Sequence, residues 1–435
     1  MPSTSLAYRL AARAAAALVP AAALLNDKVA RSHRGRLGAA DRLVRWGRDV
    51  RDRSRPVVWL HAPSVGEGLQ AESVLNHLRA RHPDWQFVYT WFSPSAEALG
   101  RRLPVGVADY LPYDVPGDVG RVLAALAPDV LVFAKLDLWP ELATRAAAGG
   151  ARVVMVAATV APGSGRLRWP ARALLDPGYA SVTLAGAISG DDAARLATLG
   201  VPSGRIRTTG DPRFDSVLEK VEAIPPDHPL LAYRQGAPTL VAGSTWPGDE
   251  RVVLDAFARL HVHRPDARLI LVPHEPTDEH LAPIDRMVSD LGLPTPVRLS
   301  HADGRPVPLL LVDRVGVLAA LYGAGGMAYV GGGFGRAGLH SVLEPAAWGI
   351  PVVFGPRWRD SRDAGLLLAA GGAESLSAFG TEEAGEALHA LWLDWIRNET
   401  RRSAQGRKAR AVVESGRGAA ERSALLVEEA MARPT

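Results

Sequence analysis

The chain of 435 residues exceeds the size that one hydrophobic core usually supports, so about two domains are expected. Apolar residues make up 47% and charged residues 22%, which excludes a disordered or fibrous protein. The chain has no cysteine, which excludes disulfides, thiolate metal ligands and a cysteine nucleophile.

Positive charge is concentrated near the N-terminus. Residues 1–56 contain twelve Lys and Arg against four Asp, a net charge of +8, so the rest of the chain carries about −4 of the overall +4. A basic arm on a nearly neutral body indicates a tether to an anionic partner, either phospholipid or nucleic acid.

The apolar run at residues 14–25 favours phospholipid. It is uncharged and flanked by basic residues. Twelve helical residues span only about 18 Å, against about 30 Å of hydrocarbon, and Pro20 interrupts the run. We therefore predict that residues 1–30 form an anchor helix lying in the membrane interface. A cleaved signal peptide and an ordinary packed helix remain alternatives.

From residue 56 onward, short apolar runs alternate with helical patterns. The first series of runs is Val57–Ala62, Gln86–Phe92, Asp129–Leu136, Arg152–Thr159 and Ser181–Ile188. The second series is Pro238–Thr245, Arg268–His274, Leu309–Asp313, Met327–Gly333 and Ile350–Pro356. Crossover helices are expected at Leu69–Ala80, Asp249–Leu260 and Leu339–Ala347. Runs that are apolar almost throughout predict parallel strands with helices on both faces.

The pattern predicts an α/β protein of two doubly wound domains in series, facing each other across a cleft. We place the first domain at residues 31–218, the second at 219–410 and a C-terminal helix at 411–435. The proline-containing stretch 215–235 is the expected linker. Because ligands bind outside the carboxyl ends of strands in such sheets, the residues directly after each apolar run are the candidates for a site.

The first such loop, residues 61–68, ends in Gly66-Glu67-Gly68 before a helix expected from about Leu69. Glu67 then lies near a helix N-terminus, where a carboxylate is electrostatically favoured. Both a helix-capping role and a general base in a cleft fit this position. His61 alone is more typical of a core histidine than of a catalyst.

A glycine-rich loop follows the run at Met327 in the second half, reading GGGFGRAGLH at residues 331–340. Glycines after a strand let backbone N–H groups approach a phosphate closely. The loop is neither a P-loop nor a dinucleotide fingerprint. Glu344, in the following helix, either holds the ribose hydroxyls of a nucleotide or is an acidic residue favoured by the helix dipole.

Five sequence blocks in this order carry a resemblance to a known family. They are HAPSVGE at 61–67, LDLWPEL at 136–142, GDPRFD at 210–215, GSTWPGDE at 243–250 and GLHSVLEPAAWGIPVVFGP at 338–356. The combination resembles the Kdo (3-deoxy-D-manno-octulosonic acid) transferase family, glycosyltransferase family 30, which begins the lipopolysaccharide inner core. The resemblance implies the GT-B fold, with two Rossmann-like domains, and a membrane-associating N-terminal helix.

The resemblance also implies roles for the matched residues. Glu67 is the catalytic base. The residues that position the acceptor or the donor sugar are Ser64, Gly66, Lys135 and Asp137. Donor binding falls on Arg213, Ser244, Thr245, Pro273, His274, Gly331, Gly332, Gly333, His340, Ser341 and Glu344.

The implied reaction is an inverting transfer of Kdo from CMP-Kdo to a lipid A precursor, lipid IVA, with no metal and no cofactor. The expected partners are CMP-Kdo, that lipid and a phospholipid surface, and the expected location is the cytoplasmic face of the inner membrane. No nucleic acid is expected, since the body of the chain has no RNA-binding module. Two alternatives stay open: another GT-B glycosyltransferase with a different nucleotide-sugar donor, and a non-catalytic lipid-binding relative.

Some positions depart from the commonest residues of the family. The departures are Lys135 for an acidic residue, Trp246 for a histidine, His274-Glu275 for Arg-His, Asp211 and Ser341 for asparagines, and a missing arginine near Thr159. We interpret the chain as a member of a divergent branch. The departures leave donor contacts and acceptor choice open, because these residue types differ in charge and reach.

Overall fold

The computed structural model describes residues 3–433 except 235 and 337. Contacts within the chain separate two compact domains: the first ends at Ser216 and is completed by residues from Gly418 onward, and the second is Val217–Arg417. The sequence pattern placed this boundary between residues 218 and 219 and set 411–435 apart as one helix. The chain instead passes between the domains twice, because its last helix packs on the first domain.

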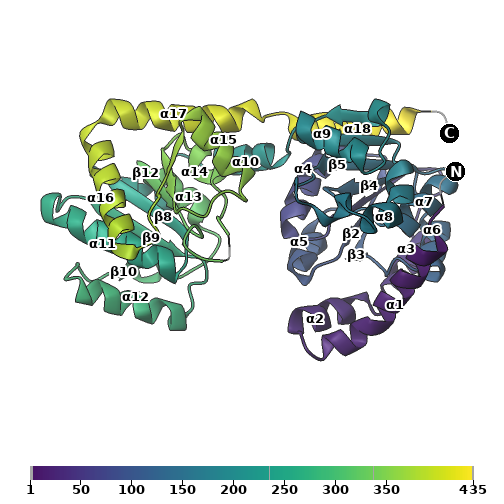
Figure 1. Ribbon diagram of the computed structural model, residues 1–435, viewed down its shortest axis with the longest axis horizontal. Coiled ribbons are helices and arrows are strands. Elements are labelled where there is room, and N and C mark those ends of the chain that lie inside the picture. Colours follow the sequence, from purple (N-terminus) through teal and green to yellow (C-terminus); the bar gives the residue numbers. More distant parts are fainter. Residues whose placement is uncertain (1–2, 235, 337, 434–435) are drawn as a thin grey trace. The chain divides into compact units, whose positions relative to one another are not determined.

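The first domain is built on a seven-stranded parallel sheet (Figure 1). Its strands are β1 (Val57–His61), β2 (Gln86–Trp91), β3 (Val107–Tyr110), β4 (Val130–Ala134), β5 (Arg152–Ala158), β6 (Leu184–Ala187) and β7 (Ile206–Thr208). Their order in space is β3-β2-β1-β4-β5-β6-β7. In a sheet of this order the winding reverses between β1 and β4, and ligands bind at the carboxyl ends of the strands next to that switch point.

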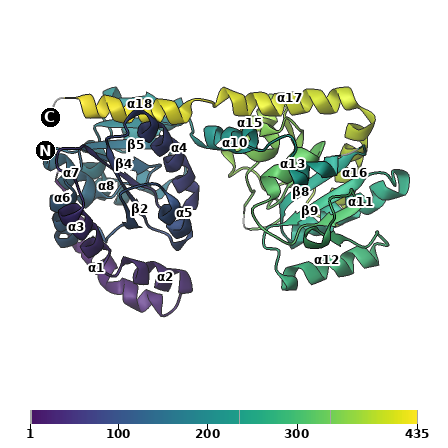
Figure 2. The same ribbon diagram turned by 180° about the vertical axis from the view of Figure 1, so that it is seen from behind.

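Helices cover both faces of the first sheet. They are α3 (Ala39–Asp49), α4 (Val65–Arg81), α5 (Glu97–Arg102), α6 (Pro116–Leu126), α7 (Pro140–Ala148), α8 (Ala171–Ala180), α9 (Gly190–Thr198) and α18 (Ala419–Ala432). Val57 and Trp59 point into the core shared with α3, α6 and α7. Val58 and Leu60 point into the core shared with α4 and α18, and Figures 1 and 2 show α18 running along the sheet beside α4. Because β1 is buried on both faces, its sequence is an almost uninterrupted apolar run.

The second domain has another seven-stranded parallel sheet. Its strands are β8 (Thr239–Thr245), β9 (Arg268–Pro273), β10 (Val297–Arg298), β11 (Leu309–Leu311), β12 (Met327–Val330), β13 (Val352–Phe354) and β14 (Ala373–Ser375). Their order is β10-β11-β9-β8-β12-β13-β14. Its helices are α11 (Pro247–His263), α12 (Asp278–Asp290), α13 (Leu318–Ala324), α14 (Leu343–Ala347), α15 (Arg362–Ala370), α16 (Thr381–Arg397) and α17 (Glu399–Ser415). Phe257 of α11 packs with Trp392 and Trp395 of α16 in the core.

The ten strands predicted from apolar runs are all present, and each sheet has two more. The additional strands, β3, β7, β10 and β14, are the edges of the two sheets. They contain only two to four residues, and each includes partly or fully exposed side chains. An edge strand pairs on one side only and needs no continuous apolar run, so the sequence pattern has no signal for it.

The helix expected from Leu69 begins earlier, at Val65. Ser64 has the extended backbone of an N-cap residue. Glu67 therefore lies in the first turn of α4, with a carboxylate at the positive end of a 17-residue helix.

Two further expectations from the sequence are corrected. The helix expected over Leu339–Ala347 begins only at Leu343, and the residues before it continue the glycine-rich loop. The linker expected over 215–235 is largely helical, since α10 (Arg213–Glu222) crosses the domain boundary and Pro229–Arg234 forms a 3-10 helix. Proline is well tolerated in the first turn of a helix, so the proline-rich composition did not exclude helix there.

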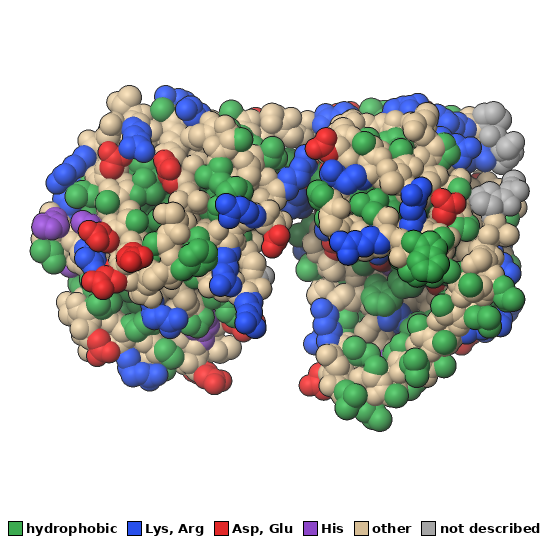
Figure 3. Space-filling view, in the orientation of Figure 1, with side chains coloured by type: hydrophobic (Ala, Val, Ile, Leu, Met, Phe, Trp, Pro, Cys, Tyr) green, Lys and Arg blue, Asp and Glu red, His purple; other side chains and the backbone are tan. Residues whose placement is uncertain are grey.

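An N-terminal arm of two helices, α1 (Leu6–Ala23) and α2 (Asp27–Arg36), precedes the sheet of the first domain. Because α1 continues through Pro20, it has 18 residues and is about 27 Å long, longer than the apolar run alone suggested. No residue of α1 is buried, and Leu24 and Leu25 at its end are 87% and 90% exposed. Figure 3 shows hydrophobic side chains gathered over the outer side of this arm. Within the described residues, α1 is the one helix with the length and composition of a membrane span.

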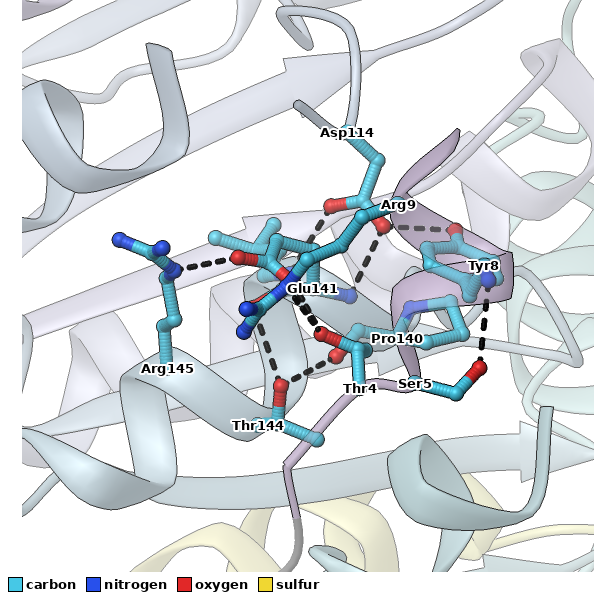
Figure 4. Close-up of polar contacts among 10 residues, drawn as sticks. Thr4, Ser5, Tyr8, Arg9, Asp114, Pro140, Glu141, Thr144 and Arg145 are labelled. Atoms are coloured by element: carbon cyan, nitrogen blue, oxygen red, sulfur yellow. Dashed lines mark hydrogen bonds and ion pairs between the residues drawn. The ribbon is translucent and has the colours of Figure 1, made fainter. Parts of the chain in front are cut away.

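Buried carboxylates fix the start of α1 to the first domain (Figure 4). Glu141, in the first turn of α7, accepts hydrogen bonds from Thr4 and from Nε of Arg9, the latter at 2.8 Å. Tyr8 donates its hydroxyl to Asp114 at 2.7 Å. Burial raises the pKa of Asp114 to about 6. The arm is therefore seated by hydrogen bonds at its base and leaves its far end exposed.

Candidate functional site

The carboxyl ends of β1 and β4 bring five predicted site residues together. The two strands are paired in parallel, so the segments that follow them lie side by side. Ser64, Gly66 and Glu67 belong to the β1–α4 segment, and Lys135 and Asp137 follow β4. The first-domain part of the candidate site is thus at the switch point of the sheet.

Glu67 is held by two donors. Nζ of Lys135 lies 2.7 Å from Oε1 of Glu67, and the Ser64 hydroxyl donates to Oε2. Burial acts to raise the pKa of Glu67, but the hydrogen bonds from Lys135 and Ser64 outweigh it and lower the pKa below its ordinary value. The residue is therefore an ionised, oriented carboxylate at neutral pH, which suits a proton acceptor.

His61 connects Asp137 to the sheet. Its ring is fully buried, its Nε2 lies 2.9 Å from Oδ2 of Asp137, and its Nδ1 lies 3.1 Å from the hydroxyl of Thr90, the residue opposite it on β2. Trp59 donates its indole N–H to the same hydroxyl at 2.9 Å. His61 is the core histidine that its sequence context favoured, and it orients Asp137.

The N-terminal arm reaches the same loops through α2. The buried guanidinium of Arg36 lies 3.6 Å above the Phe92 ring and donates to the Leu111 carbonyl at 3.0 Å. Phe92 stacks on Trp139 with ring centroids 5.2 Å apart, and the Trp139 indole donates to Asp137 at 3.1 Å. Arg36, Phe92 and Trp139 form a continuous chain of contacts from the arm to the site.

Arg213 belongs to the first domain, apart from the other predicted donor-binding residues. Its guanidinium contacts Asp211, with Nε at 2.9 Å and Nη2 at 2.7 Å from the same carboxylate oxygen. The other oxygen of Asp211 accepts from Gln70 at 2.8 Å. Asp211 therefore serves as an anchor for Arg213 between α4 and α10.

The other predicted donor-binding residues lie on three loops of the second domain. Ser244 and Thr245 end β8, Pro273 and His274 stand at the end of β9, and the residues from Gly331 to Glu344 follow β12. Strands β9, β8 and β12 are neighbours in the sheet, so these loops leave one edge side by side.

Glycine is required where the β12 loop meets the β8 loop. A Cβ at Gly331 would lie 2.2 Å from the Ser244 carbonyl oxygen, and one at Gly332 would lie 2.0 Å from the Gly338 carbonyl oxygen. Gly332 also has a φ of 99°, which favours glycine. The glycine run thus lets the loop fold tightly back against neighbouring backbone.

Asp249, which the sequence reasoning did not select, holds the two loops together. Its Oδ2 accepts the backbone N–H groups of Trp246 at 3.0 Å and Gly332 at 2.9 Å, and its Oδ1 accepts the Tyr329 hydroxyl at 2.8 Å. Burial raises its pKa. An acidic residue at the third position of a helix, two residues after a proline, is a capping signal that the sequence displays. The hydrogen bond between Asp249 and Gly332 joins distant parts of the chain, so no local sequence pattern indicates it.

Thr245 and Glu250 form a second buried pair in this domain. The Thr245 hydroxyl lies 3.2 Å from Oε1 of Glu250, which also contacts Nε2 of His280 at 2.9 Å. Burial raises the pKa of Glu250. Thr245 therefore shapes the end of β8, while the neighbouring Ser244 adopts a φ of 53°, in the left-handed region.

Trp246 connects the three loops through its ring. It donates its indole N–H to Nε2 of His340 at 2.9 Å, and His274 stacks on His340 with centroids 4.2 Å apart. Glu344, in the first turn of α14, accepts a hydrogen bond from Lys220 at 2.6 Å, and Ser341 is exposed. Within the described residues, no group of three or more His, Asp or Glu is arranged to hold a metal ion.

The chain is similar in sequence to known proteins. The profile of the family described as "3-Deoxy-D-manno-octulosonic-acid transferase (kdotransferase)" matches residues 33–216. A 3-deoxy-D-manno-octulosonic acid transferase from Bordetella pertussis is 30% identical over 393 residues, covering 86% of this chain and 87% of the relative. This chain belongs to the Kdo transferase family. A Haemophilus influenzae transferase of the same name is 26% identical over 313 residues, 68% of this chain and 70% of that protein.

Solved structures agree on the fold of this Kdo transferase. A glycosyltransferase from Rickettsia africae superposes with a TM-score of 0.56 at 10% identity, covering 87% of this chain and 100% of that one. The UDP-GlcNAc 2-epimerase of Neisseria meningitidis gives 0.56 at 14% identity, covering 83% and 99%. Both the predicted GT-B class and the predicted family are therefore confirmed.

Proposed function

We propose that this Kdo transferase moves Kdo from CMP-Kdo to a lipid A precursor, lipid IVA, with inversion at the anomeric carbon and with Glu67 as general base. The observation that carries the proposal is the state of Glu67, an ionised carboxylate at the switch point of the domain that matches the family profile. A base must be deprotonated before it acts, and Glu67 is ionised at neutral pH and held in place by Lys135 and Ser64.

In the proposed step, an acceptor hydroxyl oxygen attacks the anomeric carbon of Kdo. The bond from that carbon to the CMP phosphate oxygen breaks, and its electron pair leaves with CMP. The hydroxyl proton passes to Glu67. Lys135 and Ser64 keep the carboxylate oriented before the step, which supports efficient proton transfer.

The second domain is the proposed donor site. CMP-Kdo carries a phosphate and a sugar carboxylate, which require hydrogen-bond donors without a competing negative charge. The loops after β8, β9 and β12 offer backbone groups, Ser244 and Ser341 hydroxyls and the His340 ring. The carboxylate of Asp249 is committed to three internal donors, which leaves it buried beneath these loops.

A membrane contact through the arm completes the proposal. The exposed apolar side chains of α1 and the excess of basic residues in 1–56 suit a surface rich in anionic phospholipid, where the lipid acceptor resides. We assign the enzyme to the cytoplasmic face of the inner membrane on this basis.

The test is mass spectrometry of the purified full-length enzyme with CMP-Kdo and a tetraacyl lipid A precursor. We expect the lipid to gain Kdo, and we expect no product with UDP-GlcNAc as donor. Transfer from UDP-GlcNAc and none from CMP-Kdo would identify a different nucleotide-sugar transferase. No transfer from either donor, with the lipid still bound, would favour a non-catalytic relative.

The role of Glu67 is tested by Glu67→Gln beside a matched control, Glu72→Gln. Glu72 lies on the same helix and pairs with Arg102 at 3.1 Å. We expect Glu67→Gln to lose at least about 100-fold in kcat, the usual scale of general-base catalysis, with CMP-Kdo binding retained. Glu72→Gln should remain active. Turnover by Glu67→Gln equal to that of the wild type would remove Glu67 from the mechanism.

A further inference from the structure

Three rings from three loops form a compact cluster in the second domain. Trp246 follows β8, His274 follows β9 and His340 follows β12, and these strands are adjacent in the sheet. The His274 and His340 rings stack at 4.2 Å, and Trp246 lies 5.0 Å from His274 and 6.4 Å from His340 between ring centroids. The cluster stands at the carboxyl edge of the sheet, where this class of fold binds ligands.

The contact between Trp246 and His340 determines where the imidazole proton lies. An indole N–H is a donor only, so Nε2 of His340, 2.9 Å away, must present its lone pair. The imidazole is then neutral and carries its proton on Nδ1. Within the described part of the chain, that Nδ1–H has no protein acceptor. It is available to a ligand.

We propose that Trp246 is a positioning residue that fixes His340 as a neutral Nδ1–H donor for an anionic oxygen of the sugar nucleotide. The identity of that ligand rests on the proposed function, whereas the protonation state of His340 does not. The acceptor atom is an oxygen of the donor phosphate or of the sugar carboxylate, which is the chemistry that a single N–H in a loop cluster recognises.

Burial and one neighbouring ring reinforce the neutral state. Burial and the stacked His274 lower the pKa of His340 to about 4. His274 is the titratable group that acts on His340 within the described residues, and protonating both stacked rings would place two positive charges 4.2 Å apart. A neutral donor keeps the same strength from about pH 5.5 to 8, whereas an imidazolium would lose its attraction for an anion as pH rises past about 6.5.

The first test reads the protonation state directly in the ligand-free enzyme. ¹⁵N NMR of histidine-labelled protein, with His340 assigned from the spectrum of His340→Gln, should show the Nδ1–H tautomer throughout this pH range. Trp246→Phe keeps a ring at this position and removes the N–H, so we expect its His340 pKa to rise and its tautomers to mix. A wild-type His340 that titrates near pH 6.5, or that carries its proton on Nε2, would overturn the proposal.

The matched control is Trp348→Phe. The Trp348 indole donates to the Ala319 carbonyl at 2.7 Å in the same domain, away from the three loops. This variant removes an indole N–H of similar geometry and should leave the His340 spectrum unchanged. A change of equal size in both variants would mean that His340 responds to general loosening of the domain, and the assignment to Trp246 would fail.

The second test is the pH dependence of KM for CMP-Kdo. We expect a flat profile for the wild type, and for Trp246→Phe a KM raised about tenfold at pH 8, the worth of one hydrogen bond to a charged group, which falls again as pH is lowered. An increase that is uniform across pH would indicate a purely structural role and overturn the proposal. If CMP-Kdo is not a substrate at all, the proposed donor is wrong, and the NMR result still decides the state of His340.

Discussion

Lys135 donates from Nζ to Oε1 of Glu67 across 2.7 Å, which joins residues that are 68 positions apart in the chain. Lys135 has a φ of 62°, in the left-handed region, which costs a non-glycine residue about 1–2 kcal/mol. Its backbone N–H donates to the Val156 carbonyl at 2.8 Å, so β5 stabilises this conformation. A residue held in an unfavourable backbone conformation beside the candidate base indicates a functional constraint.

The first prediction concerns the pH profile of Lys135→Met. Removing the ammonium leaves burial as the main influence on the pKa of Glu67, so that pKa rises. Because only the ionised carboxylate accepts a proton, the acidic limb of kcat/KM should move to higher pH. Activity should therefore fall more at pH 5.5 than at pH 8. Steady-state kinetics across that range measures the shift.

Arg102→Met is the matched control, since it removes the partner of Glu72 on the same helix. Its acidic limb should coincide with that of the wild type. If Lys135→Met loses activity equally at every pH, then Lys135 contacts a substrate and does not set the ionisation of Glu67.

The second prediction concerns Asp249→Ala. The truncation leaves the Gly332 amide and the Tyr329 hydroxyl buried without the acceptor that now satisfies them. We expect a loss of about 3 kcal/mol in the free energy of unfolding of the second domain. Urea unfolding, analysed with a separate transition for each domain, measures this loss.

Asp255→Ala serves as the comparison on the same helix. Asp255 pairs with Arg259 one turn away at 2.8 Å on the surface, and such a pair contributes about 0.5 kcal/mol or less. A small effect at Asp249, similar to that at Asp255, would contradict its role as the joint between the two loops.

The sequence was a good guide to the central strands and a poor one to the sheet edges. Strands such as β1 and β8 are buried on both faces, which demands the continuous apolar runs that a sequence displays. β10, with two half-buried residues, exists because β11 offers it backbone partners. Pairing of that kind depends on tertiary structure and leaves no local pattern.

The candidate site divides in the same way. Glu67 and the glycine run follow strands, and their residue types point to chemistry, so the sequence places them near a ligand. The partners of these residues come from elsewhere in the chain: Lys135 reaches Glu67 from the segment after β4, and Asp249 reaches Gly332 from α11. Residue spacing along the chain cannot specify such contacts, because strand order sets them.

The third prediction concerns the seat of the arm, meaning the hydrogen bonds by which Thr4, Tyr8 and Arg9 attach the start of the arm to the first domain. Tyr8→Phe removes the hydroxyl that donates to the buried Asp114, which costs about 1–2 kcal/mol in the seated state. Proteolysis at the turn after α1 should therefore become faster by about tenfold, with the rest of the first domain resistant. Tyr329→Phe, which removes a hydroxyl that donates to Asp249 in the second domain, is the control.

The same seat should respond to pH in the wild type. The pKa of Asp114 is raised to about 6, so folding favours its protonated form, and its stabilising contribution is present at low pH and lost as pH rises through 6. The pKa of Glu141 is lowered, so Glu141 remains ionised through this window. The arm should be better protected from protease at pH 5 than at pH 7.5. The reverse order would contradict the assignment to Asp114.

The last prediction separates the membrane role of the arm from its structural role. Leu24→Ser with Leu25→Ser changes two side chains that are 87% and 90% exposed and leaves the seat at Thr4, Tyr8 and Arg9 intact. If these leucines insert into lipid, their loss costs at least about 3 kcal/mol of membrane affinity, or more than about 100-fold in partitioning.

Sedimentation with anionic phospholipid vesicles measures this partitioning. The control changes two exposed apolar residues of the second domain, Val262→Ser with Val315→Ser, each 76% exposed. We expect the control to bind vesicles as the wild type does and the arm variant to remain in solution. Equal binding by both variants would mean that basic residues alone hold the protein on the surface. The arm variant should still transfer Kdo to a detergent-solubilised acceptor, because the contacts of Glu67 lie outside the arm.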